Sequence, residues 1–365
     1  MKTWLRYTIN SEPLRSPRRF FLLATRHSPL ATRGQFGCGP GPRWWMVTLA
    51  AVLLPCALAA RMAAAEGSFD RTLKVTGAVE LEVATGSGHI DVRAGDSATV
   101  RVHGIIKASH SWDFDERSGE EKVRRLEANP PIEQSDNFIR VGRIEDSELR
   151  RNVSISYELV VPRETRLRSE TGSGSVTVDG VKGPVKASSG SGNLRFSNVG
   201  DELRGNTGSG DVRLQSIQGD VHLVTGSGSI EATGVSGGFV ATTGSGSIRL
   251  EQTAAGRVEI ETGSGEVEAR GVRGPLRART GSGHISAEGQ PSGEWTLHAG
   301  SGPITVHVPG EAGFDLYAQT SSGHITVDPP LTVQGTIRRG ELRGKVRGGG
   351  ARVDLSTGSG NIRVE

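Results

Sequence analysis

Two consecutive copies of an 18-residue unit decide the fold: residues 207–224 read TGSGDVRLQSIQGDVHLV, and residues 225–242 read TGSGSIEATGVSGGFVAT. Each copy opens with the phrase Thr-Gly-Ser-Gly. The phrase or a close variant returns along the chain, starting at Thr85, Thr171, Ser189, Thr207, Thr225, Thr243, Thr262, Thr280, Ala299, Thr320 and Thr357. From Thr171 to Ala299 successive starts lie 18 or 19 residues apart, and a fixed period of this length is typical of repeat architectures.

Apolar and polar residues alternate inside each copy, a period of two that predicts half-buried strands. In the copy that begins at Thr207, Val212 and Leu214 mark one short strand, and Val221 and Leu223 mark a second. We therefore predict an all-β fold, a β-solenoid of the single-stranded parallel β-helix type, with about 18 residues and two short strands per coil. A narrow interior suits Val, Ile and Leu better than rings, in line with an aromatic content of 5%.

The repeated phrase has a conformational explanation. Glycine reaches positive φ without a steric cost, and glycines at the same place in successive coils allow the corners to stack closely, while Thr and Ser can add hydroxyl ladders between coils. A phosphate cradle would require a following Lys-Ser/Thr and a helix, which the sequence lacks here. A calcium-binding roll would require Asp at a fixed place, and only Asp91 and Asp211 come close, at different offsets.

Outward positions of the first strand form a column of alternating charge. The column contains Arg213, Glu231, Arg249 and Glu268, one residue from each of four consecutive copies. Opposite charges would stand one strand spacing apart there. Because exposed pairs contribute only about 0.2–1 kcal/mol each, we expect them to select the register more than to hold the coils together.

The rhythm breaks between Thr85 and Thr171. Residues 118–129 predict a short helix that Pro130 and Pro131 end. We expect residues 1–65 to be a targeting segment, 66–162 to be N-terminal strands with a helical insert that caps the solenoid, and 163–365 to be regular repeats. The strand that ends at Glu365 follows a Gly-Ser-Gly corner and is predicted to be an open edge, which also offers a route to homo-oligomers.

The first 65 residues have the layout of an export signal. A basic stretch precedes an apolar run from Trp44 to Ala60, and the expected cleavage lies after Ala65, or alternatively after Ala59. An uncleaved anchor is the other interpretation, and it would be the chain's only route to a membrane. Both cysteines, Cys38 and Cys56, fall in this segment, so the remainder lacks disulfides and thiol ligands. We predict an exported protein that is periplasmic, on the cell surface or secreted.

The charge of the chain is concentrated at this N-terminus. The whole sequence carries a net +3, but residues 1–65 hold nine of the 43 Lys and Arg and one of the 40 acids. The remaining 34 basic and 39 acidic residues give a net charge of about −5. A nucleic-acid binder needs clustered Lys and Arg to displace counterions from phosphates, so no nucleic-acid partner is expected.

No pattern in the sequence indicates a catalytic, cofactor-binding or metal-binding site, and no cofactor is expected. The acids of the insert are predicted to be a solvated surface: Asp113, Asp115, Glu116, Glu120 and Glu121. The histidines of the corners are His89, His284 and His324. The last two should lie two coils apart, about 9–10 Å by strand spacing, too far to share one metal. Aromatic residues are too scattered for a sugar-stacking row, and Trp295 is expected in the core.

Three segments carry a resemblance to a known family. Tyr157 to Pro162 (YELVVP), followed by Thr171 to Val176 (TGSGSV), and the closing GKVRGGG of residues 344–350 resemble the bacterial "putative adhesin" family of β-strand-repeat domains over roughly residues 68–365. That family has no assigned biochemical activity, and the resemblance implies an exported β-helical protein.

We therefore expect a non-enzymatic, structural or adhesin-like module of the cell envelope or surface whose partner is an unidentified envelope protein or glycan. The alternatives are a polysaccharide-processing β-helix enzyme, which would need an acidic cleft beside the insert, and an envelope scaffold that polymerises end to end.

Overall fold

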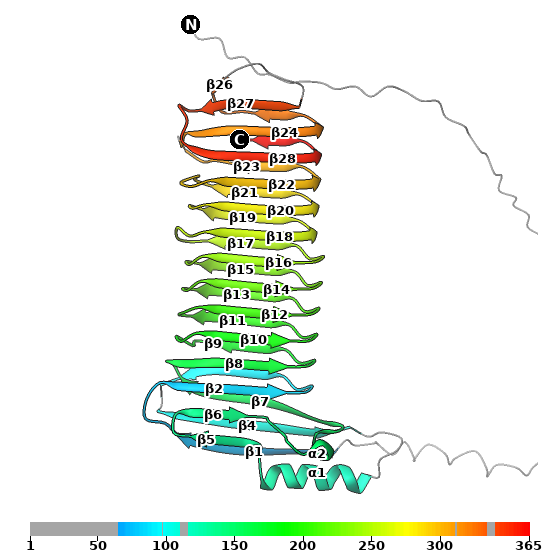
Figure 1. Ribbon diagram of the computed structural model, residues 1–365. Coiled ribbons are helices and arrows are strands. Elements are labelled where there is room, and N and C mark those ends of the chain that lie inside the picture. The colour runs from blue at the N-terminus through cyan, green and yellow to red at the C-terminus, as the bar shows by residue number, and fades with distance from the viewer. Residues whose placement is uncertain (1–64, 97, 110–115, 311, 334–339) are drawn as a thin grey trace, which may run out of the picture. The chain divides into compact units, whose positions relative to one another are not determined.

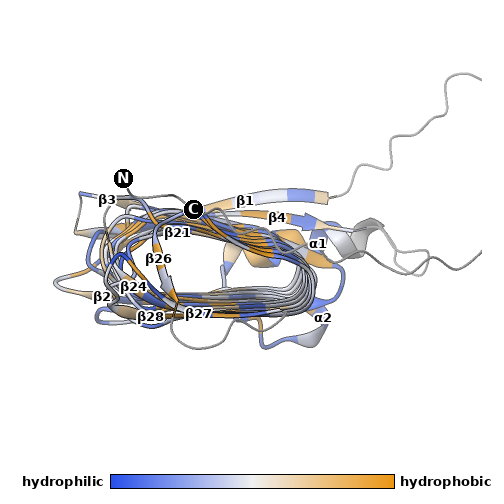
Figure 2. Cartoon of the chain, turned by 90° about the horizontal axis from the view of Figure 1, so that it is seen from above, coloured by the Kyte–Doolittle hydropathy of each residue, from blue (hydrophilic) through white to orange (hydrophobic). Residues whose placement is uncertain are grey.

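The computed structural model describes residues 65–96, 98–109, 116–310, 312–333 and 340–365, and of residues 116–118 only the backbone. In this part of the chain two long sheets face each other and form a stack of flattened coils, as Figures 1 and 2 show. The predicted all-β solenoid is confirmed. The predicted export signal lies outside the described residues except for Ala65, as do Trp112, Asp113 and Asp115.

The first sheet contains 14 described strands and the second 15. In spatial order the first consists of β1 (Ala65–Lys74), β4 (Thr99–Ala108), β7 (Val153–Pro162), β3 (Ile90–Gly95), β9 (Val176–Asp179), β11 (Leu194–Val199), β13 (Val212–Ile217), β15 (Ile230–Val235), β17 (Ile248–Gln252), β19 (Val267–Val272), β21 (Ile285–Gly289), β23 (Ile304–His307), β29 (Ile362–Val364) and β25 (Ile325–Val327). The second consists of β26 (Leu331–Val333), β27 (Glu341–Val346), β24 (Phe314–Ser322), β28 (Ala351–Ser359), β22 (Trp295–Ser301), β20 (Leu276–Ser282), β18 (Val258–Ser264), β16 (Phe239–Thr243), β14 (Val221–Thr225), β12 (Leu203–Thr207), β10 (Val185–Ser189), β8 (Thr165–Thr171), β2 (Val79–Thr85), β6 (Phe138–Val141) and β5 (Ile132–Ser135). The helices are α1 (Glu116–Ala128) and α2 (Ser147–Arg150).

The repeated coils pair in parallel and in register, so equivalent residues of successive copies lie side by side. Val212 pairs with Ile230, which pairs with Ile248. All three are buried, as the alternation predicts. Trp295 is buried in the same interior, and its indole Nε1 donates a hydrogen bond to the Gly274 carbonyl at 2.9 Å. The inward columns therefore form one continuous apolar core along the stack.

The threonine of each phrase holds two coils together at the corner. Thr225 is buried, and its Oγ1 donates to the Gly210 carbonyl of the preceding coil at 3.0 Å and accepts from the Gly228 amide at 3.2 Å. Thr207 and Thr243 make the same pair of contacts. The hydroxyls thus link the coils through main-chain groups, which would otherwise be buried without partners.

Replacing this hydroxyl by a methyl group should cost stability. Thr225→Val keeps the branched shape but leaves the Gly210 carbonyl and the Gly228 amide without partners, so we expect a loss of about 1–3 kcal/mol in the free energy of unfolding. This loss of stability is measured by thermal unfolding, monitored by circular dichroism. Ser227→Ala, at an exposed place in the same corner, is the control and should leave the melting temperature unchanged. Equal melting temperatures for wild type and Thr225→Val would contradict this role.

The glycines of the phrase are required by close stacking. A Cβ at Gly210 would overlap the carbonyl oxygen of Gly192, and a Cβ at Gly228 would overlap that of Gly210. Neither glycine has a positive φ. The expectation that positive φ explains the phrase is therefore wrong at these corners, where the approach of one backbone to the next is the physical reason.

The N-terminal end of the stack is covered by the insert. The predicted helix is confirmed as α1, which contacts β1 and β4 and buries Val123 and Leu126. The Glu127 carboxylate accepts a hydrogen bond from the Ser68 amide at 2.9 Å, and so satisfies a backbone donor of the edge strand β1. The coil of β2 and β3 pairs directly with β8 and β9 and so continues the regular stack.

The C-terminal end departs from the order of the sequence. The coil of β28 and β29 lies between the coil of β22 and β23 and the coil of β24 and β25. Because β29 pairs on both sides, the predicted open edge at Glu365 is wrong. In sequence order the outer coil, β24 and β25, comes first. The chain then returns through β26 and β27, and its last coil, β28 and β29, lies between that outer coil and the coil of β22 and β23. His284 and His324 are consequently three coils apart, where two were expected.

Candidate functional site

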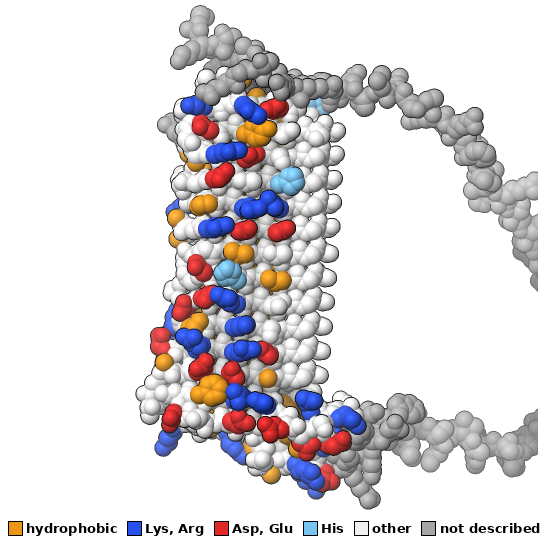
Figure 3. Space-filling view, in the orientation of Figure 1, with side chains coloured by type: hydrophobic (Ala, Val, Ile, Leu, Met, Phe, Trp, Pro, Cys, Tyr) orange, Lys and Arg blue, Asp and Glu red, His pale blue; other side chains and the backbone are white. Residues whose placement is uncertain are grey.

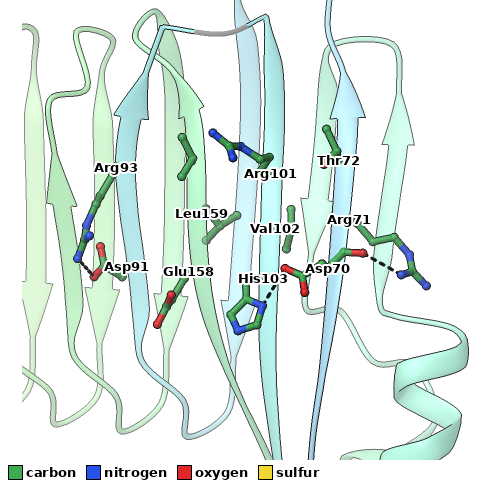
Figure 4. A pocket seen from close by; sticks show the side chains of 11 residues that line it. Asp70, Arg71, Thr72, Asp91, Arg93, Arg101, Val102, His103, Glu158 and Leu159 are labelled. Atoms are coloured by element: carbon green, nitrogen blue, oxygen red, sulfur yellow. Dashed lines mark hydrogen bonds and ion pairs between the residues drawn. The ribbon is translucent and has the colours of Figure 1, made fainter.

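A hollow of about 240 Å³ lies on the outer face of the first sheet, where β1, β4, β7 and β3 meet (Figure 4). These strands come from both sides of the insert. Since β4 runs antiparallel to β1 and β7, residues far apart in the sequence become neighbours there. Beneath the hollow lie the inward residues Val102 and Leu159, both buried in the core.

Strand pairing arranges the polar lining in two rows. The carboxylate row consists of Asp70, His103, Glu158 and Asp91, which stand opposite one another on four adjacent strands. The arginine row, two residues along, consists of Thr72, Arg101, Val160 and Arg93. Members of one row therefore stand at the spacing of neighbouring strands, about 4.8 Å, and the two rows lie about 6.6 Å apart along the strands.

Part of this lining is satisfied within the protein. His103 Nδ1 lies 2.9 Å from Asp70 Oδ1, and Arg93 donates to Asp91 Oδ2 at 3.0 Å. Arg93 also stands opposite Asp179 of β9. Hydrogen bonds from the Ser197 hydroxyl and the Asn198 amide lower the pKa of Asp179, so this carboxylate also presents a negative charge to Arg93.

Charged side chains of the hollow include groups that have no partner among the described residues. Within the part of the chain that the structure describes, no hydrogen bond or ion pair engages the side chains of Glu158 and Arg101. Asp91 Oδ1 is buried and accepts no hydrogen bond, although the side chain as a whole is 25% exposed. The hollow therefore offers one unengaged carboxylate, that of Glu158, and one guanidinium donor, that of Arg101, to a ligand.

Tyr157 supports the hollow from the inside. Its ring is buried and meets Phe69 edge-on, with 6.5 Å between the ring centroids. Burial raises the pKa of the Tyr157 hydroxyl far above its usual value, so the phenol stays neutral. The residue that opens the YELVVP segment is thus a packing residue, whereas the next one, Glu158, faces outward into the hollow.

Other residues singled out in the sequence have surface or structural roles. Glu120 and Glu121 are exposed on α1 and form ion pairs with Arg124 and Arg125, which confirms the solvated surface for these two acids. Among the described residues, no three His, Cys, Asp or Glu are grouped to hold a metal ion. Neither described helix is long and apolar enough to cross a bilayer.

The predicted charge column is confirmed. Arg213 lies 3.6 Å from Glu231, and Arg249 lies 3.2 Å from Glu268. On the opposite sheet the two signs are also interspersed, as the outer face in Figure 3 shows, while the corner built by the repeated phrase is a column without charge. These surfaces present no extended field of one sign.

The sequence contains the members of the hollow without indicating that they meet. Asp91 stands out only as an incomplete calcium motif, and Glu158 only as part of the family resemblance. Asp70, His103 and Arg101 follow no motif. Their juxtaposition depends on the antiparallel pairing of β4 with β1 and β7, which alternation of apolar residues does not reveal.

Comparisons with known proteins identify the family of this chain. The family model described as Toastrack DUF4097 matches residues 79–365, in line with the resemblance to β-strand-repeat domains. One similar solved structure is a "putative cell adhesion protein" from Clostridium sporogenes ATCC 15579, with 13% identity, a TM-score of 0.21 and coverage of 82% of this chain and 98% of that one. Another is a "putative adhesin" from Bacteroides fragilis NCTC 9343, with 13% identity, a TM-score of 0.29 and coverage of 82% and 97%. No curated protein matches the chain.

Proposed function

We propose that this chain, which belongs to the Toastrack DUF4097 family over residues 79–365, is an exported, non-enzymatic, adhesin-like module of the cell envelope. In this proposal the hollow holds a neutral, hydroxyl-rich glycan. The observation that carries this proposal is the pair of unengaged side chains Glu158 and Arg101, set in adjacent rows of the hollow.

The alternation of charge selects the class of ligand. A hydroxyl group both donates and accepts, so neighbouring hydroxyls of a sugar can donate to Glu158 and accept from Arg101. An anionic ligand would meet the carboxylate row, and a cationic one would meet the arginine row. Val160 stands half-buried in the arginine row and offers an apolar contact to the C–H face of a sugar ring.

Exposure supports binding rather than catalysis. The Asp70 side chain is 82% exposed, and Glu158 is also exposed. A general acid is usually tuned by removing its carboxyl from water, which an open sheet face does not do. Export is supported by the basic and apolar N-terminal segment and by the absence of cysteine after residue 65.

Binding to a panel of neutral oligosaccharides, measured by isothermal titration calorimetry, tests the proposal. We expect Glu158→Gln and Arg101→Gln each to weaken binding about tenfold or more, because each removes one charge-assisted hydrogen bond. Arg195→Gln and Glu251→Gln are matched controls, since both side chains are exposed on the same sheet outside the hollow. Failure of every glycan to bind, or equal losses in the controls, would overturn the proposed site.

A second candidate function follows from one observation. Asp91 and Glu158 stand opposite each other on adjacent strands beside the insert, which places two carboxyl groups near the separation that retaining glycosidases use, about 5 Å. A polysaccharide-processing enzyme would release new reducing ends from the bound glycan, and Glu158→Gln would abolish them. Binding without product supports the adhesin-like function instead.

A further inference from the structure

The last coil of the chain occupies a slot between two coils that precede it in the sequence (Figure 1). We propose that this coil, residues 351–365, is exchangeable: the slot accepts the same segment from a second copy of the chain, and two copies pair by reciprocal exchange. This interaction surface is separate from the hollow and does not depend on what the hollow binds.

The slot is a complete binding surface on both sides. β28 pairs in parallel with β22 and with β24, and β29 pairs with β23 and with β25. The corner of the segment is fixed twice, because Thr357 Oγ1 donates to the Gly302 carbonyl and Thr320 Oγ1 donates to the Gly360 carbonyl, each at 2.9 Å. Withdrawal of the segment would uncover four strand edges, two in each sheet, together with an apolar interior, and such surfaces recruit a replacement strand.

The slot is matched to the sequence of this segment. Val353 and Leu355 are buried against Trp295 and Leu297 on one side and against Leu316 and Ala318 on the other. An occupant must supply inward apolar residues at these positions and a Thr-Gly-Ser-Gly corner in the correct register. A second copy of the chain supplies all of them, whereas an unrelated strand would not.

The connection into the segment favours exchange. Residues 347–350 link β27 to β28 and all have positive φ: 50° at Arg347, 92° at Gly348, 89° at Gly349 and 159° at Gly350. Arg347 carries a side chain in the left-handed region, which stores backbone strain. Short, strained hinges promote domain swapping because the extended hinge relieves the strain.

Disulfide trapping between two differently tagged chains tests the exchange. Both are full-length chains in a Cys38→Ser/Cys56→Ser background; one carries Thr305→Cys and the other Arg363→Cys. Thr305 and Arg363 are directly paired across β23 and β29, at a spacing that a disulfide can bridge. The chains are mixed under reducing conditions, warmed to just below the midpoint of unfolding, cooled and oxidised. In an exchanged pair, Cys at 305 of one chain meets Cys at 363 of the other.

We expect the yield of disulfide-linked heterodimer to exceed the yield from a control mixture by about tenfold. The reason is that the exchanged strand holds the two sulfur atoms at the distance of paired residues on adjacent strands. The control replaces Arg363→Cys with Arg195→Cys, an exposed position in a distant coil of the same sheet. Circular dichroism confirms that each variant folds. Light scattering of the oxidised mixture should give the mass of two chains. A heterodimer yield equal to the control, with folded chains, would overturn the proposal.

Discussion

Gly210→Ala is expected to unfold the coils around residue 210, with a loss of about 3 kcal/mol or more in the free energy of unfolding. The added Cβ would overlap the Gly192 carbonyl oxygen, and the surrounding atoms are backbone from a neighbouring corner rather than the tip of a movable side chain. Relief requires the two coils to separate, which breaks the ladder between β12 and β10.

Thermal unfolding by circular dichroism measures this effect, and the matched control lies one residue away. Ser209→Ala changes an exposed side chain in the same corner, so its melting temperature should stay that of the wild type. If Gly210→Ala and Ser209→Ala have the same melting temperature, the coils do not approach as closely as described. Close stacking would then not explain why glycine occupies these positions.

Ile248→Asp is the second change with a large expected effect. Ile248 is fully buried between Ile230 and Val267, and the narrow interior holds no partner for a carboxylate. The unpaired charge should cost about 4 kcal/mol or more and lower the melting temperature sharply.

Arg249→Ser is the control for this prediction. It removes an ion pair with Glu268 in which the arginine side chain is 60% exposed, and such pairs contribute about 1 kcal/mol or less. The two variants differ by one position in the same strand, so they report which side of the sheet each residue faces. Comparable shifts in melting temperature would show that the inward and outward assignments are wrong.

The repeat itself could be predicted because its physics is local and is copied many times. Alternation placed Val212, Ile230 and Ile248 in one inward column, and pairing in the structure follows that column. The charge column from Arg213 to Glu268 followed from the same register. A shift by one residue would turn every side chain to the other face, so a single consistent register satisfies all the copies.

One break in the pattern has a structural explanation. Gln252 pairs with Val235 of the preceding coil, at a position where several coils have Val or Ile, and it is buried. Its side-chain Nε2 donates to the Gly237 carbonyl at 3.0 Å, while its Oε1 has no partner. The amide thus replaces an apolar contact by a hydrogen bond to the preceding coil, in one of the two copies whose length is 19 residues instead of 18.

The order of the last coils and the hollow could not be predicted for a related reason. Near-identical copies present near-identical edges, so the alternation in residues 351–365 fits beside residues 295–307 or beyond residues 314–327 equally well. The hollow depends on antiparallel pairing within the non-repeating part, where Arg101 and Glu158 are separated by the whole insert. Neither feature has a local signature in the sequence.

Disulfide formation within a single chain tests the layered order most directly. In a Cys38→Ser/Cys56→Ser background, the pair Thr305→Cys/Arg363→Cys should form a disulfide on mild oxidation, because these residues are paired across adjacent strands. The pair Thr305→Cys/Thr326→Cys should remain reduced, since β29 lies between β23 and β25 and separates them by about 10 Å. A disulfide in the second pair and none in the first would show coils stacked in sequence order and would contradict the structure described for this chain.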